Sequence, residues 1–134
     1  AHPELEIVIN GGIATLEEAA RHLDHVDGVM LGRAAYQNPG ILAEVDRRFF
    51  DPAASVLSPE EAVRAYRPFV ERELARGARL QGLVKPLLGL FQGRPGARAF
   101  RRVLSEGSLK DNAGPELLEA ALRPVERQPL TEAA

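Results

Sequence analysis

The chain has 134 residues, 45% of them hydrophobic, and a formal net charge of −2, and its length is that of about one average domain. No apolar run reaches the roughly 18 residues that cross a membrane, so we expect no membrane contact. The absence of cysteine excludes disulfides, a thiolate nucleophile and zinc–thiolate sites within this chain. With only three histidines, we also expect no metal site.

Two short apolar runs near the N-terminus each end in a glycine turn. They cover residues 7–13 (IVINGGI) and 28–34 (GVMLGRA). Near-continuous hydrophobic runs too short for a helix are typical of strands buried on both faces of a parallel sheet. Between them, Thr15 to His25 is predicted as a helix, because it opens with the capping-box sequence TLEE and has apolar residues at helical spacing. The order is therefore β-α-β.

The two glycine turns predict an anion site at the carboxyl ends of these strands. Glycine lets the backbone N–H groups of Gly11, Gly12 and Gly32 approach a ligand closely, and a helix start adds donors that suit phosphate. Arg33 can bind the same anion in bidentate fashion. In (β/α)₈ barrels the loops after the last two strands often build a phosphate site, although such turns also occur in α/β proteins that bind no phosphate.

The rest of the chain is predicted to be helical, in a bundle of about four helices. A first helix starts at Asn38-Pro39 and ends near Phe49. The others are expected at residues 59–76, at 80–91 with a bend or a division at Pro86, at 97–105, and from Gly114-Pro115 to about 122, with a frayed tail from about 124. We expect most phenylalanines to be core residues rather than base-stacking platforms: Phe49, Phe50, Phe69, Phe91 and Phe100.

Charge is divided unevenly along the chain. Residues 79–110 hold seven basic side chains against one acid, Glu106, a local charge of +6, and the remaining residues have a net charge of −8. The basic residues are Arg79, Lys85, Arg94, Arg98, Arg101, Arg102 and Lys110. A run of charge is often only a solvated face, but the scarcity of interleaved acid points to an anionic partner.

The β-α-β unit cannot form a domain by itself, because two strands of buried type leave both sheet edges unpaired and both faces uncovered. Nothing downstream supplies more strands. We therefore expect an α/β part at residues 1–50 and a helical domain at 51–134, and interpret the chain as the C-terminal piece of a longer protein.

The sequence resembles the tRNA-dihydrouridine synthases, specifically the bacterial A-type, over roughly residues 5–122. The resemblance lies in INGGI at 9–13, in DGVMLGRAAYQNP at 27–39 and in LGLFQG at 88–93, and it extends through PGAR at 95–98, Arg101-Arg102 and LSE at 104–106. It departs from the family at Lys85-Pro86-Leu87, where the A-type usually has Arg-His-Met.

The resemblance implies a cytoplasmic enzyme in which an FMN-binding (β/α)₈ TIM barrel precedes a helical tRNA-binding domain. NADPH reduces the flavin, and the flavin reduces specific uridines of tRNA to dihydrouridine. Matched by motif, the FMN phosphate would be bound by Asn10, Gly11, Gly12, Gly32 and Arg33. Arg98 and Arg101, with Arg102 beside them, would contact tRNA.

The family's catalytic acid is a cysteine on an upstream barrel loop, and this chain has none. We therefore expect no catalytic residue here and no activity from the isolated segment, which would need the upstream part of the barrel. Two other interpretations stay open. One is a different FMN-dependent barrel, similar to dihydroorotate dehydrogenase, and the other is a non-catalytic RNA-binding helical module.

Overall fold

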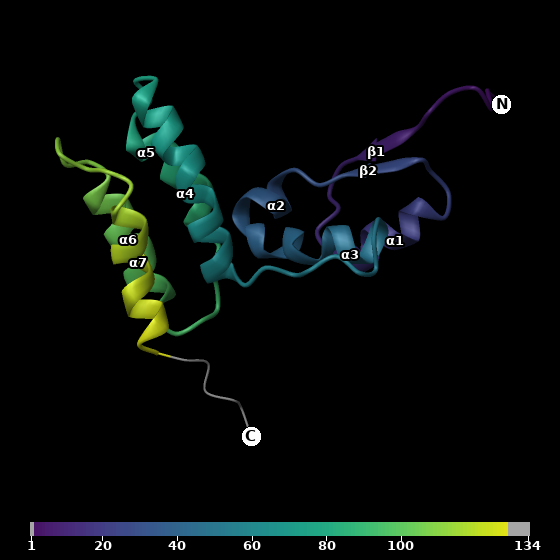
Figure 1. Ribbon diagram of the computed structural model, residues 1–134. Helices are drawn as coiled ribbons and strands as arrows, with labels where there is room; N and C mark the ends of the chain where they lie inside the picture. Colours follow the sequence, from purple (N-terminus) through teal and green to yellow (C-terminus); the bar gives the residue numbers. More distant parts are fainter. Residues whose placement is uncertain (1, 129–134) are drawn as a thin grey trace. The chain divides into compact units, whose positions relative to one another are not determined.

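The computed structural model describes residues 2–128. The chain forms two compact units, which meet in sequence between Val56 and Leu57 (Figure 1). The first unit carries a small sheet with short helices, and the second is built from helices within the part of the chain that is described.

The predicted β-α-β order is confirmed in the first unit. Strands β1 (Val8–Asn10) and β2 (Gly28–Met30) are parallel, with Val8 opposite Gly28 and Asn10 opposite Met30, and helix α1 (Leu16–Leu23) connects them. Asp27 fixes the entry to this pair, because its carboxylate accepts a hydrogen bond from the Ile7 N–H at 2.8 Å. The carboxyl ends of both strands therefore lie at the same edge of the sheet.

The predicted capping box of α1 is only half formed. The Thr15 hydroxyl accepts from the Glu18 N–H at 3.1 Å, as the motif requires. The Glu18 carboxylate, however, accepts from the Ala14 N–H at 3.0 Å instead of from the N–H of Thr15. The Glu18 carboxylate is therefore bound by the N–H of Ala14, one residue before the N-cap, in the turn that leads from β1 to α1.

After β2 the structure corrects the sequence prediction. The glycine turn at Gly32 opens onto a helix, as expected, but this helix is a separate short element, α2 (Arg33–Gln37), that begins before the predicted start at Asn38-Pro39. The single helix expected from Asn38-Pro39 to Phe49 is instead a 3₁₀ helix, η1 (Pro39–Glu44), followed by α3 (Val45–Phe49). Proline explains the break after α2, since Pro39 has no N–H and disfavours helical backbone at Asn38.

The sheet of the first unit is open. Among the described hydrophobic residues of this unit, only Ile13, Leu16 and Ala19 are buried. The side chains of Val8 on β1 and Met30 on β2 are 55% and 46% exposed. Both strands nevertheless have the continuous apolar sequence that is typical of strands buried on both faces. With two strands and α1 there is not enough structure to cover both faces.

The second unit begins with a fully capped helix, α4 (Pro59–Ala75). Ser58 accepts from the Glu61 N–H at 3.1 Å, and Glu61 accepts from the Ser58 N–H at 2.7 Å. Helix α5 (Leu80–Val84) and the 3₁₀ helix η2 (Lys85–Leu87) follow. The helix predicted over 80–91 therefore stops early, because Pro86 removes a donor and turns occupy the residues from Leu88 to Gly96.

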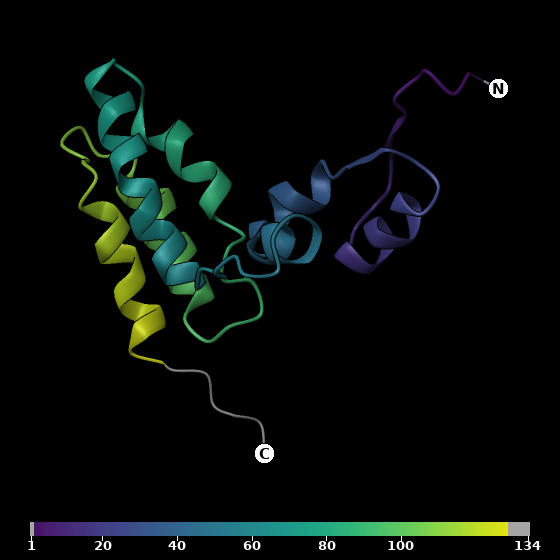
Figure 2. The same cartoon turned by 45° about the vertical axis from the view of Figure 1, so that its right-hand side comes forward.

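Helices α6 (Ala97–Gly107) and α7 (Leu117–Glu126) complete this unit (Figure 2). The expected fraying from about residue 124 is wrong for the end of α7, which runs through Pro124 to Glu126. Val125 has no exposed surface, so its packing outweighs the hydrogen bond that Pro124 cannot donate. The rest of the predicted tail, residues 129–134, lies outside the described residues.

All four helices contribute to one hydrophobic core in the second unit. Phe91 and Phe100 are in its centre, at 1% and 0% exposure, with their rings edge to face at a centroid distance of 4.6 Å. The core prediction is wrong for Phe50 and Phe69, which are 79% and 38% exposed. The core consists of Val63, Val70, Leu80, Val84, Leu87, Leu90, Phe91, Phe100, Leu104, Leu118, Ala121, Leu122 and Val125.

The start of α6 packs closely against the backbone of α7. Gly96 has φ +86°, and a Cβ atom there would lie 2.6 Å from the carbonyl oxygen of Pro124. Only glycine satisfies both the left-handed backbone and this distance. The start of α6 is therefore fixed against α7.

Candidate functional site

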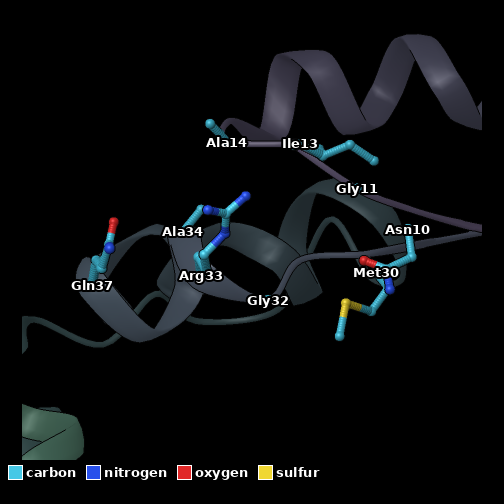
Figure 3. Close-up of a pocket in the computed structure, with 10 residues that line it drawn as sticks. Asn10, Gly11, Ile13, Ala14, Met30, Gly32, Arg33, Ala34 and Gln37 are labelled. Carbon is cyan, nitrogen blue, oxygen red and sulfur yellow. The ribbon is translucent and has the colours of Figure 1, made fainter.

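All five residues predicted to bind a phosphate line one pocket in the first unit. Asn10, Gly11 and Gly12 reach it from the end of β1, and Gly32 and Arg33 from the end of β2 (Figure 3). Its volume is about 360 Å³. The parallel pairing explains this convergence, because it brings the two glycine turns to the same edge of the sheet.

The turns offer backbone donors to this pocket. Gly11 and Gly12 adopt φ values of +130° and +71°, which residues with a side chain rarely adopt. Among the residues that line the pocket, six have an N–H group without a hydrogen-bond acceptor within residues 2–128: Gly11, Gly12, Ile13, Gly32, Arg33 and Ala34. Since a Cβ atom on Gly11 or Gly12 would meet nothing within 4 Å, the glycines are required here by backbone conformation rather than by crowding.

Arg33 adds a cation to these donors. It is the first residue of α2, and its side chain extends toward the turn at Ile13 and Ala14 (Figure 3). Arg33 is exposed and forms no ion pair with any residue between 2 and 128. A guanidinium beside unpaired N–H groups is the arrangement that holds a phosphate or another oxyanion.

Gln37 is a polar residue of this pocket that was not predicted from the sequence. It lies four residues after Arg33 on α2 and lines the same pocket. The i, i+4 spacing was a usable signal, but the predicted helix start at Asn38-Pro39 left Gln37 outside the helix. Tyr36, which the family motif places nearby, is 59% exposed and is not a lining residue.

The predicted RNA-binding arginines lie on α6 in the second unit. Arg98, Arg101 and Arg102 are exposed and have no ion-pair partner among the described residues. Arg98 and Arg102 line a shallow depression of about 380 Å³ together with Arg94 and Gln128. Arg101 does not line it, so the structure groups Arg98 with Arg102 rather than with Arg101.

Arg94 differs from the other cations of the basic stretch. Its guanidinium donates to the Glu60 carboxylate at 2.6 Å, and both side chains are largely buried, at 21% and 17% exposure. The Arg94 hydrogen bond holds the pKa of Glu60 below its ordinary value against an opposing effect of burial. The local charge of +6 is thus partly balanced by an acid that lies outside residues 79–110.

Within residues 2–128, no three His, Asp or Glu side chains gather where they could hold a metal ion. In the same residues no helix has the length and apolar character needed to cross a membrane.

Comparison with known proteins identifies the family. The family model described as dihydrouridine synthase (Dus) matches residues 1–126. The tRNA-dihydrouridine(20/20a) synthase of Yersinia pestis is 54% identical over 120 residues, which are 90% of this chain and 35% of that protein. Those of Escherichia coli K12 and Vibrio cholerae are 54% and 47% identical, over 92% and 96% of this chain.

The chain spans only 36% of the length of the Escherichia coli relative and 39% of that of the Vibrio cholerae relative. Both the family match and these identities extend across the two units of the structure. The family expected from the sequence motifs is confirmed, and this chain belongs to the dihydrouridine synthase family.

Proposed function

We propose that this chain is the C-terminal part of an FMN-dependent tRNA-dihydrouridine synthase that uses NADPH to reduce uridines of tRNA. Its relatives are named for positions 20 and 20a, and we extend those positions to this protein. The observation that carries the proposal is the convergence of two glycine turns and Arg33 on one pocket in a chain of this family.

The pocket fits the phosphate of FMN. The N–H groups of Gly11, Gly12 and Gly32 would hold the phosphate oxygens, and Arg33 would neutralise their charge. Asn10 and Gln37 supply further polar groups on two sides of the same pocket. FMN supplies hydride chemistry when bound, and these residues of the chain would fix its phosphate end.

The open sheet of the first unit favours the proposal that further strands of a barrel pack against it. Val8 and Met30, on paired strands, are 55% and 46% exposed, and Ile7 beside them is 54% exposed. Apolar strand faces and two free sheet edges are covered in folded proteins. We infer that upstream strands of the same polypeptide complete a (β/α)₈ barrel against this unit.

The helical unit would bind tRNA through α6. Its exposed arginines without acidic partners suit the phosphate backbone of RNA, which dominates the affinity of such complexes. The 134-residue segment would bind without catalysing, because the cysteine acid of the family lies outside it and the chain itself has no cysteine.

The first experiment is the visible absorption spectrum of the protein expressed from its complete reading frame and purified without added flavin. We expect an oxidised-flavin spectrum, lost or strongly reduced in Arg33→Ala. Arg21→Ala, which removes an exposed arginine that does not line the pocket, is the matched control and should retain the flavin. A colourless, folded wild-type protein would contradict the proposed cofactor.

The acceptor is tested with the same protein after reduction by NADPH. Unmodified tRNA should accelerate reoxidation of the flavin and acquire dihydrouridine at positions 20 and 20a. A tRNA that already contains dihydrouridine at these positions should not accelerate reoxidation. If tRNA has no effect on reoxidation, the enzyme acts on another substrate. Dihydrouridine formation by the 134-residue segment alone would contradict the proposed division of roles.

A further inference from the structure

Arg94 is held from three directions at the turn before α6. The Glu60 carboxylate, on the first turn of α4, accepts from its guanidinium at 2.6 Å. The ring of Phe91 lies 5.0 Å from the guanidinium carbon, measured to the ring centroid, a cation–π distance. The Arg94 N–H donates to the carbonyl of Phe91 at 3.0 Å. Both the side chain and the backbone of this arginine are therefore fixed.

The position of Arg94 also fixes the start of α6. Its carbonyl accepts from the Ala97 N–H at 3.2 Å, and Gly96 between them packs so closely on α7 that a Cβ atom would lie 2.6 Å from the Pro124 carbonyl oxygen. Arg98 is the second residue of α6, and Arg102 lies about one turn further along the helix. Any reorientation of Arg94 would consequently move these two arginines.

The depression that these arginines share has an unbalanced charge. Its lining residues are Arg94, Gly96, Ala97, Arg98, Ala99, Arg102 and Gln128, and none of them is acidic. Glu60 neutralises Arg94 from outside this set, and the buried Nε of Arg94 has no hydrogen-bond partner within residues 2–128. Arg98 and Arg102 are left to face an anion with their full charge.

We propose that Glu60 is a positioning residue for RNA binding: through Arg94 it fixes the start of α6 so that Arg98 and Arg102 flank one backbone phosphate in this depression. The inference rests on the proposed function and adds to it a residue on α4 that carries the wrong charge to touch RNA. Glu60 acts on the arginines and not on the phosphate.

The test is steady-state kinetics of the enzyme from its complete reading frame, with NADPH and an unmodified tRNA transcript. In Glu60→Gln we expect the KM for tRNA to rise about five- to tenfold, as for loss of one charge-assisted hydrogen bond. The KM for NADPH and kcat at saturating tRNA should stay unchanged. Glu71→Gln removes an acid of the same helix that pairs with Arg67, away from the depression, and should leave all three constants unchanged.

A merely structural ion pair would lower the melting temperature of Glu60→Gln without changing the KM for tRNA, and that result would overturn the proposal. The exchanged variant Glu60→Arg/Arg94→Glu covers the case in which the single variant does not fold. It restores an ion pair but places an acid in the depression, so we expect a high KM for tRNA with near-normal stability. A wild-type KM for tRNA in the exchanged variant would also overturn the proposal. Failure of the proposed function is distinguishable, because the wild-type enzyme would then not reduce tRNA at all.

Discussion

The two units of this chain would recognise anions in opposite ways. In the first, an open two-stranded sheet presents backbone N–H groups from two glycine turns, and one arginine assists them. In the second, a closed core supports a helix whose exposed arginines carry the charge. The affinity that backbone N–H groups give for an anion depends on the conformation of the chain, whereas the affinity that arginine side chains give depends on charge and on salt concentration. Substitutions in the two units should therefore fail for different physical reasons.

The largest effect should come from the closed core, in Phe100→Ala. Phe100 has no exposed surface and meets the ring of Phe91 edge to face, so the truncation leaves a cavity and costs about 3–5 kcal/mol of unfolding free energy. Urea denaturation followed by circular dichroism measures the loss. Leu109→Ala, at a side chain that is 64% exposed, is the control and should change stability by less than about 0.5 kcal/mol. Equal losses in the two variants would mean that this core does not stabilise the helical unit.

A second prediction separates backbone strain from crowding at three glycines that have positive φ angles. Gly96→Ala should destabilise by about 2–4 kcal/mol, because the new methyl group meets the Pro124 carbonyl oxygen in addition to the strained backbone. Gly77→Ala, at the end of α4 with φ +91° and open space around it, should cost only about 1 kcal/mol. Thermal unfolding measures both.

In the first unit, Gly12→Ala should resemble Gly77→Ala in stability, since its φ is +71° and its surroundings are also open. The full-length protein should nevertheless lose flavin affinity, because relaxation of the strain moves the N–H groups of the turn. Normal flavin content in Gly12→Ala would contradict the role of backbone donors in this pocket.

Much of the fold was predictable, because local signals and packing agree. The parallel strands, α1 and α4 follow from apolar runs and capping sequences, and the Ser58–Glu61 box is fully formed. That the candidate phosphate-binding residues converge on one pocket was predictable for the same reason: they adjoin two strand ends, and parallel pairing brings those ends together. None of this required knowledge of distant contacts.

The differences arise where distant contacts decide the outcome. Nothing in the local sequence shows that Val125 packs in the core, so the last helix was expected to end near residue 122 and the chain to fray from about 124. Likewise, Glu60 is 34 positions from Arg94, and a count of charge over residues 79–110 cannot include their ion pair. The depression that groups Arg98 with Arg102 also includes Gln128, which is distant in sequence and lies two residues after the end of α7.

A third prediction concerns salt. If Arg98 and Arg102 flank one phosphate, Arg98→Ala and Arg102→Ala should each weaken tRNA binding at all RNA sequences and reduce the slope of log affinity against log salt, by about 1 when both are replaced. Arg64→Ala is the control, since Arg64 already pairs with Glu119 and Glu126. Fluorescence anisotropy with labelled tRNA at several salt concentrations gives the slopes. An unchanged slope in both α6 variants would place the RNA on another surface.

The smallest effect compares one ion pair from each unit as pH changes. The pKa of Glu60 is lowered by its hydrogen bond from Arg94, and the pKa of Glu17 by its hydrogen bond from Arg48. A carboxyl whose pKa falls on folding stabilises the protein above its unfolded pKa, and this contribution is lost as pH drops through the folded value.

The stabilities of wild type and Glu60→Gln should thus differ by about 1 kcal/mol at pH 7 and converge below about pH 4. Glu17, with a side chain that is 65% exposed, is screened by water, so Glu17→Gln should show a smaller difference at every pH. Melting temperatures measured from pH 3 to pH 7 test both variants. A difference for Glu60→Gln that persists at pH 3 would mean that packing, and not the charge of Glu60, accounts for its contribution.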